Sequence, residues 1–110
     1  MTAETAKILD EIRPELHKVL PQGARLLLFG SRARGDERPD SDWDLLVLLD
    51  HEGRATDRDM DDVVFPLYMI LWDRSMTANV MPYTQSEWSG KKGRSLFYHN
   101  VMDDAIEVCR

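Results

Sequence analysis

Two short apolar runs, joined by a polar segment that opens with glycine, constrain the fold of this chain more than any other feature. The first run, Arg25–Phe29, reads Arg-Leu-Leu-Leu-Phe and lies between turn-forming residues, which predicts a buried strand. The second run, Trp43–Leu49, predicts another strand. Gly30 and Ser31 follow the first run directly and predict a short helical turn, with Ser31 as its N-cap. The chain must therefore bury a small sheet that contains both strands.

Helical spacing of apolar residues predicts helices on either side of this pair. The first helix should run from about Glu4 to Leu20, and Pro14 inside it should kink or split it. A second helix should begin near Asp57, with the Asp57 carboxylate as its cap, and continue to about Leu71. Its aspartates at the start favour the helix dipole and should face water.

The last third of the chain predicts one more strand and one more helix. Residues Thr77–Thr84 are typical of a strand, and Pro82 places it at an edge of the sheet. Ser95 should cap a final helix that carries Phe97, Val101, Ala105 and Val108. The aromatic residues of this half could lie in the core or on a partner surface, and we expect the core. They are Trp72, Trp88, Phe97 and Tyr98.

The order of elements predicts an α+β fold with a small mixed sheet of three to four strands and helices packed on one face. A chain of 110 residues is long enough for one domain, which we place at residues 1–110. Its composition, with 43% hydrophobic and 31% charged residues, is typical of a globular protein.

Charge narrows the possible ligands. The net charge of −6 argues against general nucleic-acid binding, which needs a broad basic surface. Several arginines nevertheless gather around the first strand and the turn after it, which fits a small phosphate-bearing ligand. They are Arg25, Arg32, Arg34 and Arg38.

Cysteine content and hydropathy indicate a compartment. The single cysteine, Cys109, cannot form an internal disulfide and suits a reducing environment. No apolar stretch approaches the roughly 20 residues of a membrane span, and no leader sequence is evident. We therefore expect a cytoplasmic protein without a membrane partner.

The turn after the first strand has the features of a phosphate cradle. Gly30 has no side chain, so a ligand can approach its backbone. Ser31 begins a helical turn whose free backbone N–H groups and hydroxyl would point at one spot. Arg32 and Arg34 add positive charge nearby. We predict that Gly30, Ser31, Arg32 and Arg34 bind the phosphates of a nucleotide.

Two carboxylates open the second strand. Asp42 and Asp44 are two residues apart, so in a strand they point to the same side. Hard oxygen ligands beside a phosphate cradle suit Mg²⁺, which binds through one or two carboxylates and substrate phosphates. One or two Mg²⁺ ions at Asp42 and Asp44 would support displacement at phosphorus, so both residues are the predicted metal ligands and catalytic residues. The predicted reaction class is phosphoryl or nucleotidyl transfer.

At these residues the sequence resembles the minimal nucleotidyltransferases of the polymerase-beta-like superfamily. The family pattern is Gly-Ser, ten residues and Asp-x-Asp, which Gly30, Ser31, Asp42 and Asp44 match. Arg34-Gly35 and Ser41 match its usual intervening residues. The resemblance implies the polymerase-beta-like nucleotidyltransferase fold, ATP as the nucleotide, and Mg²⁺ held by the two aspartates. It also implies a role as the antitoxin of a small helical HEPN-type ribonuclease toxin, in some members by transfer of AMP to a toxin tyrosine.

The third strand departs from the superfamily pattern. Its members usually carry a third carboxylate there, whereas Thr77–Thr84 contains no acid and Asn79 is the nearest polar candidate. An amide oxygen can bind Mg²⁺ weakly but cannot act as a base. Two functions therefore stay open: transfer of AMP to a hydroxyl of a partner protein, or inhibition of that partner by binding alone. Homodimerisation is a further possibility.

Overall fold

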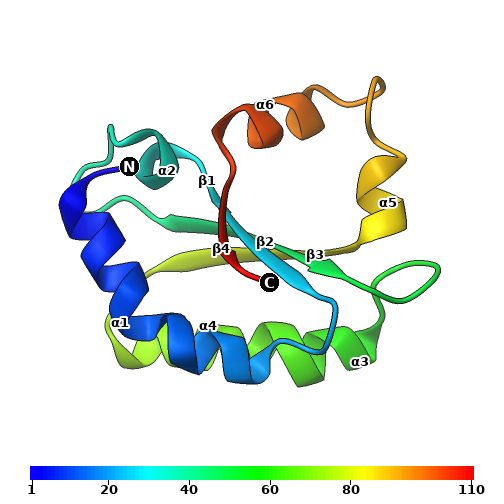
Figure 1. Ribbon diagram of the computed structural model, residues 1–110, viewed down its shortest axis with the longest axis horizontal. Coiled ribbons are helices and arrows are strands. Elements are labelled where there is room, and N and C mark those ends of the chain that lie inside the picture. The colour runs from blue at the N-terminus through cyan, green and yellow to red at the C-terminus, as the bar shows by residue number, and fades with distance from the viewer.

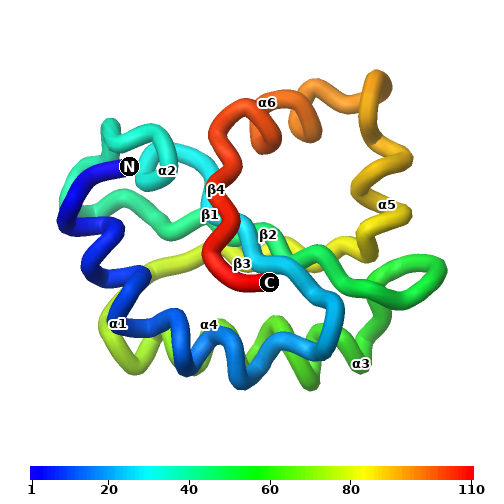
Figure 2. Tube along the Cα trace, viewed as in Figure 1, coloured from blue at the N-terminus to red at the C-terminus, as the bar shows by residue number.

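The two predicted strands form with the predicted bounds and lie at the centre of a four-stranded sheet. In the computed structural model, which describes residues 1–110, β1 (Arg25–Phe29) and β2 (Trp43–Leu49) pair antiparallel. β3 (Ala78–Thr84) adds to β2 in parallel, and β4 (Ile106–Cys109) adds to β1 antiparallel. The strand order β3-β2-β1-β4 makes a mixed sheet and places β3 at an edge, as Pro82 predicts (Figures 1 and 2).

The C-terminal strand β4 was not predicted. Val108 was expected on the last helix, but α6 (Leu96–Asp104) ends before it, and Ala105 has a non-helical backbone. Val108 is buried beside β1, where an otherwise open strand edge offers backbone partners to the alternating Ile-Glu-Val-Cys segment. The free edge of β1, which lies 80 residues away along the chain, therefore decides the conformation of this segment.

Helix α1 (Ala3–Val19) covers one face of the sheet and is continuous through Pro14. The predicted split does not occur. Pro14 is exposed, so water can satisfy the carbonyl group that the missing N–H leaves free. Leu9, Ile12 and Leu16 are buried on both sides of the proline and hold the two halves of the helix on the sheet.

The second long helix lies beside α1 on the same face (Figure 1). It consists of α3 (Asp57–Asp59), a π-helical segment η1 (Met60–Val64) and α4 (Phe65–Asp73). Thr56, not Asp57, is the N-cap, because its hydroxyl accepts the Asp59 N–H while the Asp59 carboxylate accepts the Thr56 N–H. The wide π turn ends at Val64, two residues before Pro66, whose ring crowds the preceding turn and whose missing N–H removes one helical hydrogen bond.

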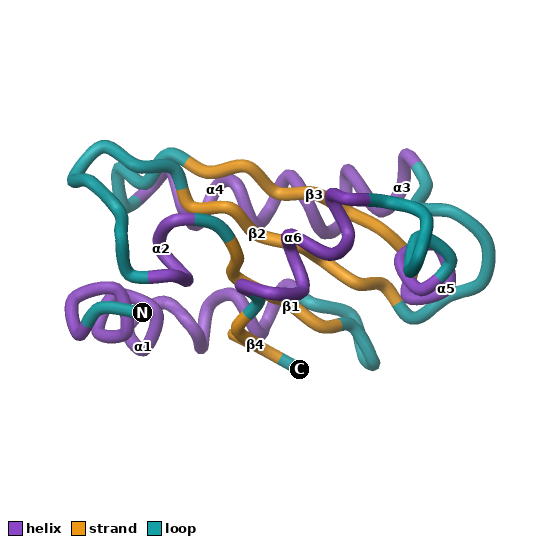
Figure 3. Tube along the Cα trace, turned by 90° about the horizontal axis from the view of Figure 1, so that it is seen from above, coloured by secondary structure: helices purple, strands orange, loops and turns teal.

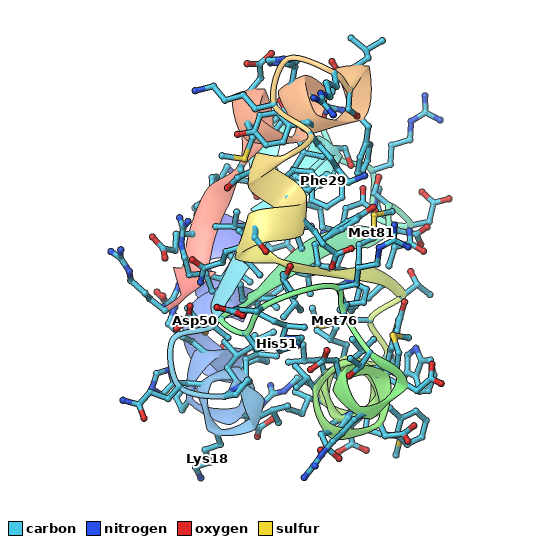
Figure 4. All side chains as sticks on the ribbon, turned by 90° about the vertical axis from the view of Figure 1, so that its right-hand side faces the viewer. Lys18, Phe29, Asp50, His51, Met76 and Met81 are labelled. Carbon is cyan, nitrogen blue, oxygen red and sulfur yellow. The ribbon has the colours of Figure 1, made fainter.

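Side chains alternate between the two faces of the sheet. Leu26, Leu28 and the residues of β2 on the same side pack under the two long helices. Leu27, Phe29, Leu46 and Leu48 pack on the other face, under α5 (Gln85–Ser89) and α6. The predicted α+β fold with helices on one face holds for the long helices, and a shorter pair covers the second face (Figures 3 and 4). The predicted cap of α6, Ser95, accepts the Tyr98 N–H.

The aromatic residues divide between core and surface. Trp88 is buried, as expected, whereas Trp72 is 52% exposed and Phe97 is 37% exposed. Trp72 lies on the outer side of α4, which no other layer of the protein covers. These exposed apolar residues do not mark a membrane span, since none of the helices combines the necessary length and apolar character.

Most of the outer side of β3 is closed to further strands. The Val80 N–H donates to the Tyr68 hydroxyl at 2.9 Å, and the Thr84 N–H donates to the Glu87 carboxylate at 3.0 Å. Pro82 between them has no N–H. Because alternate residues of a strand point their N–H groups to the same side, these three positions leave the Ala78 N–H as the outward donor of β3 that an added strand could use.

Candidate active site

The turn between β1 and α2 (Ser31–Arg34) favours glycine at position 30. Gly30 has φ of +78°, and a Cβ atom there would collide with the Asp44 carboxylate. Gly30 is also the N-cap of α2, so the prediction that Ser31 caps the turn is wrong. Ser31 is instead the first helical residue, because the positive φ at Gly30 already ends the strand and starts the helix. The backbone of Gly30, which has no side chain, thus lies against the Asp44 carboxylate.

Asp42, Asp44 and Asn79 converge at the ends of two neighbouring strands. Parallel pairing places Asp44 opposite Asn79, and Asp42 lies one residue before β2. The Asn79 Nδ2 group donates to Asp44 Oδ1 at 3.1 Å and to Asp42 Oδ2 at 3.4 Å. One atom therefore reaches both carboxylates, so their oxygens surround a common point.

The charge of this pair is not neutralised inside the protein. None of the ion pairs in the structure includes Asp42 or Asp44. Asp42 is exposed and Asp44 is partly exposed, so both are open to a ligand. Two adjacent anions without a cation form a place where a bound cation lowers the electrostatic energy.

The residues present fit Mg²⁺ if the substrate completes its shell. No group of three or more His, Cys, Asp or Glu side chains that could hold a metal occurs in the structure, which agrees with the missing third acid. The set is two carboxylates and one amide, and half a turn of the Asn79 amide would present its oxygen. Mg²⁺ commonly binds through one or two carboxylates with substrate phosphates and water as its other ligands. The metal-binding role of Asp42 and Asp44, with Asn79 as third ligand, stays a prediction.

Arg32 holds the residue that precedes the carboxylate pair. Its Nε and Nη2 groups donate to the Ser41 carbonyl oxygen at 3.0 and 2.9 Å. The guanidinium also lies 4.3 Å from the centre of the Trp43 ring, which is buried below it. Arg32 therefore joins α2 to the start of β2 on both sides of Asp42.

Arg34 joins α2 to α6. It donates to Asp104 at 2.7 Å and to Asp36 at 3.2 Å, and these hydrogen bonds, the one to Asp104 first, raise the pKa of the guanidinium. Arg34 and Arg32 thus both have partners within the protein. Phosphate binding by these two arginines stays a prediction, and it would require them to add to or exchange these contacts.

Glu37 belongs to the support of the site, although the sequence pattern did not single it out. Glu37 Oε1 accepts from the hydroxyls of Thr2 at 2.9 Å and Thr5 at 2.8 Å, which fastens the loop before Asp42 to the start of α1. The Thr5 hydrogen bond is the main cause that lowers the pKa of Glu37. Two threonines one helical turn apart, at the start of a helix, are the sequence signal that could have indicated an anionic partner.

Comparison with known proteins places this arrangement in a family. Residues 7–102 match the nucleotidyltransferase domain family. The bifunctional uridylyltransferase/uridylyl-removing enzymes of Bordetella pertussis and Bordetella avium are 40% and 37% identical to this chain over 75 residues. This alignment covers 66% of the chain but only 8% of each enzyme, so the chain is similar to one small part of those proteins.

The fold has a counterpart among solved structures. The chain matches the crystal structure of a toxin–antitoxin with AMP-PNP, with a TM-score of 0.57 and 15% sequence identity, over 94% of this chain and 71% of the other. At this identity the match concerns the fold, and it agrees with the predicted α+β architecture. Since the family match spans most of the sequence, including Gly30, Ser31 and both aspartates, this chain belongs to the nucleotidyltransferase domain family.

Proposed function

We propose that this chain is a Mg²⁺-dependent nucleotidyltransferase that uses ATP and transfers AMP to a hydroxyl of a partner protein. The partner would be a HEPN-type ribonuclease toxin that the transfer neutralises. One observation carries the proposal: Asp42 and Asp44 converge on Asn79 beside the Gly30 turn, and no cation of the protein neutralises them. A nucleotide with its metal would supply the missing positive charge and occupy the turn.

The backbone of α2 provides the contacts for the phosphates. The first N–H groups of a helix have no acceptor within the helix, so those of Ser31 and Arg32 can donate to phosphate oxygens. Gly30 touches Asp44, so a phosphate held at this turn lies next to the carboxylate pair. Mg²⁺ bound by Asp42 and Asp44 would supply charge neutralisation and polarise the phosphoryl oxygens.

The transfer itself needs alignment and a proton acceptor. The acceptor oxygen forms a bond to the α-phosphorus, the bond to the β-phosphate oxygen breaks, and pyrophosphate leaves. Asn79 cannot take the proton of the attacking hydroxyl. The proton therefore goes to Asp42, to Asp44 or to a group of the substrate, while Arg32 keeps Asp42 in place through Ser41.

Two neighbours support the choice of nucleotide and acceptor. The toxin–antitoxin structure that shares this fold contains AMP-PNP, an ATP analogue, which favours ATP and a toxin as acceptor. The Bordetella enzymes are named for uridylyl transfer, which makes UTP the nucleotide to test beside ATP. The alternative function, inhibition of the partner by binding alone, is favoured by Asn79 in place of a third acid.

Mass spectrometry of the partner tests the proposal. The protein is incubated with Mg²⁺, ATP or UTP, and the product of the adjacent gene, and the masses of both proteins are measured. We expect one AMP on the partner with ATP, and its loss in the double variant Asp42→Ala, Asp44→Ala. Asp50→Ala with Glu52→Ala, which removes two exposed acids beyond the Leu49 end of β2, is the matched control and should transfer normally.

One result would contradict transfer, and another would change the nucleotide. An unmodified partner that the double aspartate variant inhibits as well as the wild type would assign the chain to inhibition by binding. If the partner gains UMP and never AMP, the nucleotide substrate is UTP and not ATP. The proposed catalytic role of the aspartates would still hold.

A further inference from the structure

One helix carries half of the large apolar side chains that the protein exposes. Met60, Phe65, Met69 and Trp72 are between 43% and 56% exposed, and together we call them the α4 face. Phe65, Met69 and Trp72 follow one another at helical spacing and therefore form a single line along the helix. An exposed apolar line of this kind marks an interaction surface more often than scattered single residues do.

The α4 face is ordered in advance of binding. Trp72 stacks on Tyr68 with ring centres 5.1 Å apart and meets Phe65 edge to face at 6.5 Å. Tyr68 is itself fixed, because its hydroxyl accepts the Val80 N–H of β3. A hollow of about 340 Å³ lies among these rings, Met60 and Val64. Rigid aromatic side chains around a hollow are typical of the residues that contribute most to binding energy.

The neighbouring strand excludes one common mode of binding. A peptide can add as a strand only to an edge with free N–H groups, and the outer donors of β3 at Val80 and Thr84 are already used, while Pro82 has none. An apolar line on a helix instead fits a second helix laid along it. The shape therefore favours a helical occupant.

Charge decides between a second copy and a different protein. The rim of the α4 face holds Asp57, Asp61, Asp62 and Asp73. Arg58 pairs with Asp62 at 3.1 Å, and Arg74 is directed to Glu11 and Glu15 of α1 at 4.0 and 3.5 Å, so neither arginine offsets the remaining aspartates. Two copies joined through this face would bring aspartates against aspartates. A partner with lysine or arginine around an apolar centre complements the rim.

We propose that the α4 face binds a cationic amphipathic helix of a partner protein. Its apolar side fills the hollow beside Phe65 and Trp72, and its basic residues lie against Asp61 and Asp73. Trp72 is close to the end of α4, from which the chain turns directly into β3 and Asn79 (Figure 1). The Trp72 part of the face therefore lies towards the end of the sheet that holds Asp42 and Asp44.

Tryptophan fluorescence gives a direct test, because Trp72 is exposed whereas Trp43 and Trp88 are each only 3% exposed. The full chain is titrated, without nucleotide, with a synthetic leucine–lysine helix of about 18 residues, which makes about five turns. A leucine–glutamate helix with the same leucine pattern is the charge control. We expect saturable binding of the lysine peptide with a blue shift of the emission, weaker binding as salt rises, and no binding of the glutamate peptide.

Two variants locate the binding on the α4 face. Phe65→Ser with Met69→Ser should weaken binding of the lysine peptide by at least about tenfold, as expected for the loss of apolar anchors. Asp61→Asn with Asp73→Asn should weaken it and flatten its salt dependence. Leu96→Ser, at a residue that is 77% exposed on α6, and Asp103→Asn with Asp40→Asn are matched controls and should bind normally.

The proposal fails if neither peptide binds, if both bind equally, or if the α4-face variants bind as tightly as the wild type. Sedimentation that shows a dimer abolished by the serine variants would assign the face to a second copy. Because no nucleotide is present, failure here leaves the proposed transfer untouched, and failure of transfer leaves this binding surface standing.

Discussion

The two ends of strands β2 and β3 use carboxylates in opposite ways. At the end beyond Leu49, Glu87 Oε1 accepts the N–H groups of Ala55 at 2.7 Å and Thr84 at 3.0 Å. At the end that begins with Trp43, Asp42 and Asp44 accept hydrogen bonds only from the Asn79 amide. Carboxylates thus fasten a loop at one end of the two strands, whereas at the other end they remain open to a ligand.

The pKa values of the titratable groups at the Leu49 end reflect their structural role. Burial is the largest single influence and would raise the pKa values of Asp59 and Glu87. Backbone hydrogen bonds, side-chain hydrogen bonds and the nearby charges of His51 and Arg54 together outweigh it and lower both pKa values. His51 contacts the Glu52 carbonyl and lies 2.7 Å from Asp59, and these contacts, the carbonyl first, raise its pKa. Asp50 and His51 mark this end in Figure 4. The comparison indicates that a carboxylate with its hydrogen bonds satisfied supports structure, whereas an unsatisfied pair is available for a ligand.

Asp44→Asn should have the largest effect, and it tests most directly whether only the Trp43 end of the strands binds a ligand. Loss of one of the two proposed metal-binding carboxylates should lower the affinity for Mn²⁺ with AMP-PNP at least about 100-fold, more than loss of an outer-shell partner. The melting temperature should stay the same or rise, because no ion pair is lost and repulsion of Asp42 decreases. Calorimetric titration measures the affinity, and thermal unfolding measures the melting temperature. Asp50→Asn, at the other end of β2, is the control, and an equal loss of affinity there would refute a local site.

Gly30→Ala should have the second-largest effect. Its φ of +78° and the collision with the Asp44 carboxylate should reduce the free energy of unfolding by about 1 to 3 kcal/mol and weaken metal binding. Gly53→Ala is a matched control, since Gly53 has φ of +80° with no atom within 4 Å of an added Cβ. Denaturant unfolding should show the larger loss at Gly30. Equal losses would mean that the contact with Asp44 contributes nothing beyond backbone strain.

Glu87→Ala should show the reverse pattern to Asp44→Asn. It leaves the N–H groups of Ala55 and Thr84 without an acceptor, which should cost about 1 to 2 kcal/mol of unfolding free energy. Metal affinity should not change. Glu52→Ala, which removes an exposed acid of the same loop, is the control and should leave stability within about 0.5 kcal/mol of the wild type. A weaker metal site in Glu87→Ala would show that the two ends are coupled.

Asn79→Asp tests whether the third position belongs to the site. A third carboxylate should raise metal affinity by roughly tenfold, because affinity follows the charge of the ligands. Without metal the variant should melt at a lower temperature, since the donor shared by Asp42 and Asp44 is replaced by an anion. Added Mn²⁺ should reverse this loss. Asn100→Asp on α6 is the control, and indistinguishable behaviour of the two variants would remove Asn79 from the site.

His51→Gln should have the smallest effect, and that effect should depend on pH. The pKa of His51 is raised in the folded protein above its ordinary value of 6.5, so its stabilising contribution is complete below pH 6.5 and is lost as pH rises through the folded pKa. The difference in melting temperature between wild type and variant should therefore be largest in mild acid and vanish in alkali. A difference that grows with pH would contradict the assigned contacts.

Most of the fold could be predicted because its determinants are local. The apolar runs of β1 and β2, the helical spacing in α1 and the Ser95 cap all depend on residues close together in sequence. β4 could not be predicted, because four residues acquire their strand conformation from the free edge of β1. The cap of α3 was misplaced by one residue, because Thr56 and Asp57 are both good caps and only backbone geometry separates them.

For the site, the sequence by itself determined that Gly30 follows one strand and that Asp42 and Asp44 open the next. The antiparallel pairing of β1 with β2 then brings Asp44 to Gly30. Only the tertiary structure decided that Asn79 joins them, because the parallel register between β2 and β3 sets which residue lies opposite Asp44.

The tertiary structure alone also decided which apolar residues remain exposed. Helical periodicity shows that Phe65 and Trp72 are apolar and on one helix, but burial depends on whether another layer of the protein covers that side of α4. None does, so Trp72, which was expected in the core, forms an exposed surface with Phe65 instead. The local sequence pattern determines whether a segment forms a helix or a strand. The packing of the layers determines which of its side chains stay exposed and available for binding.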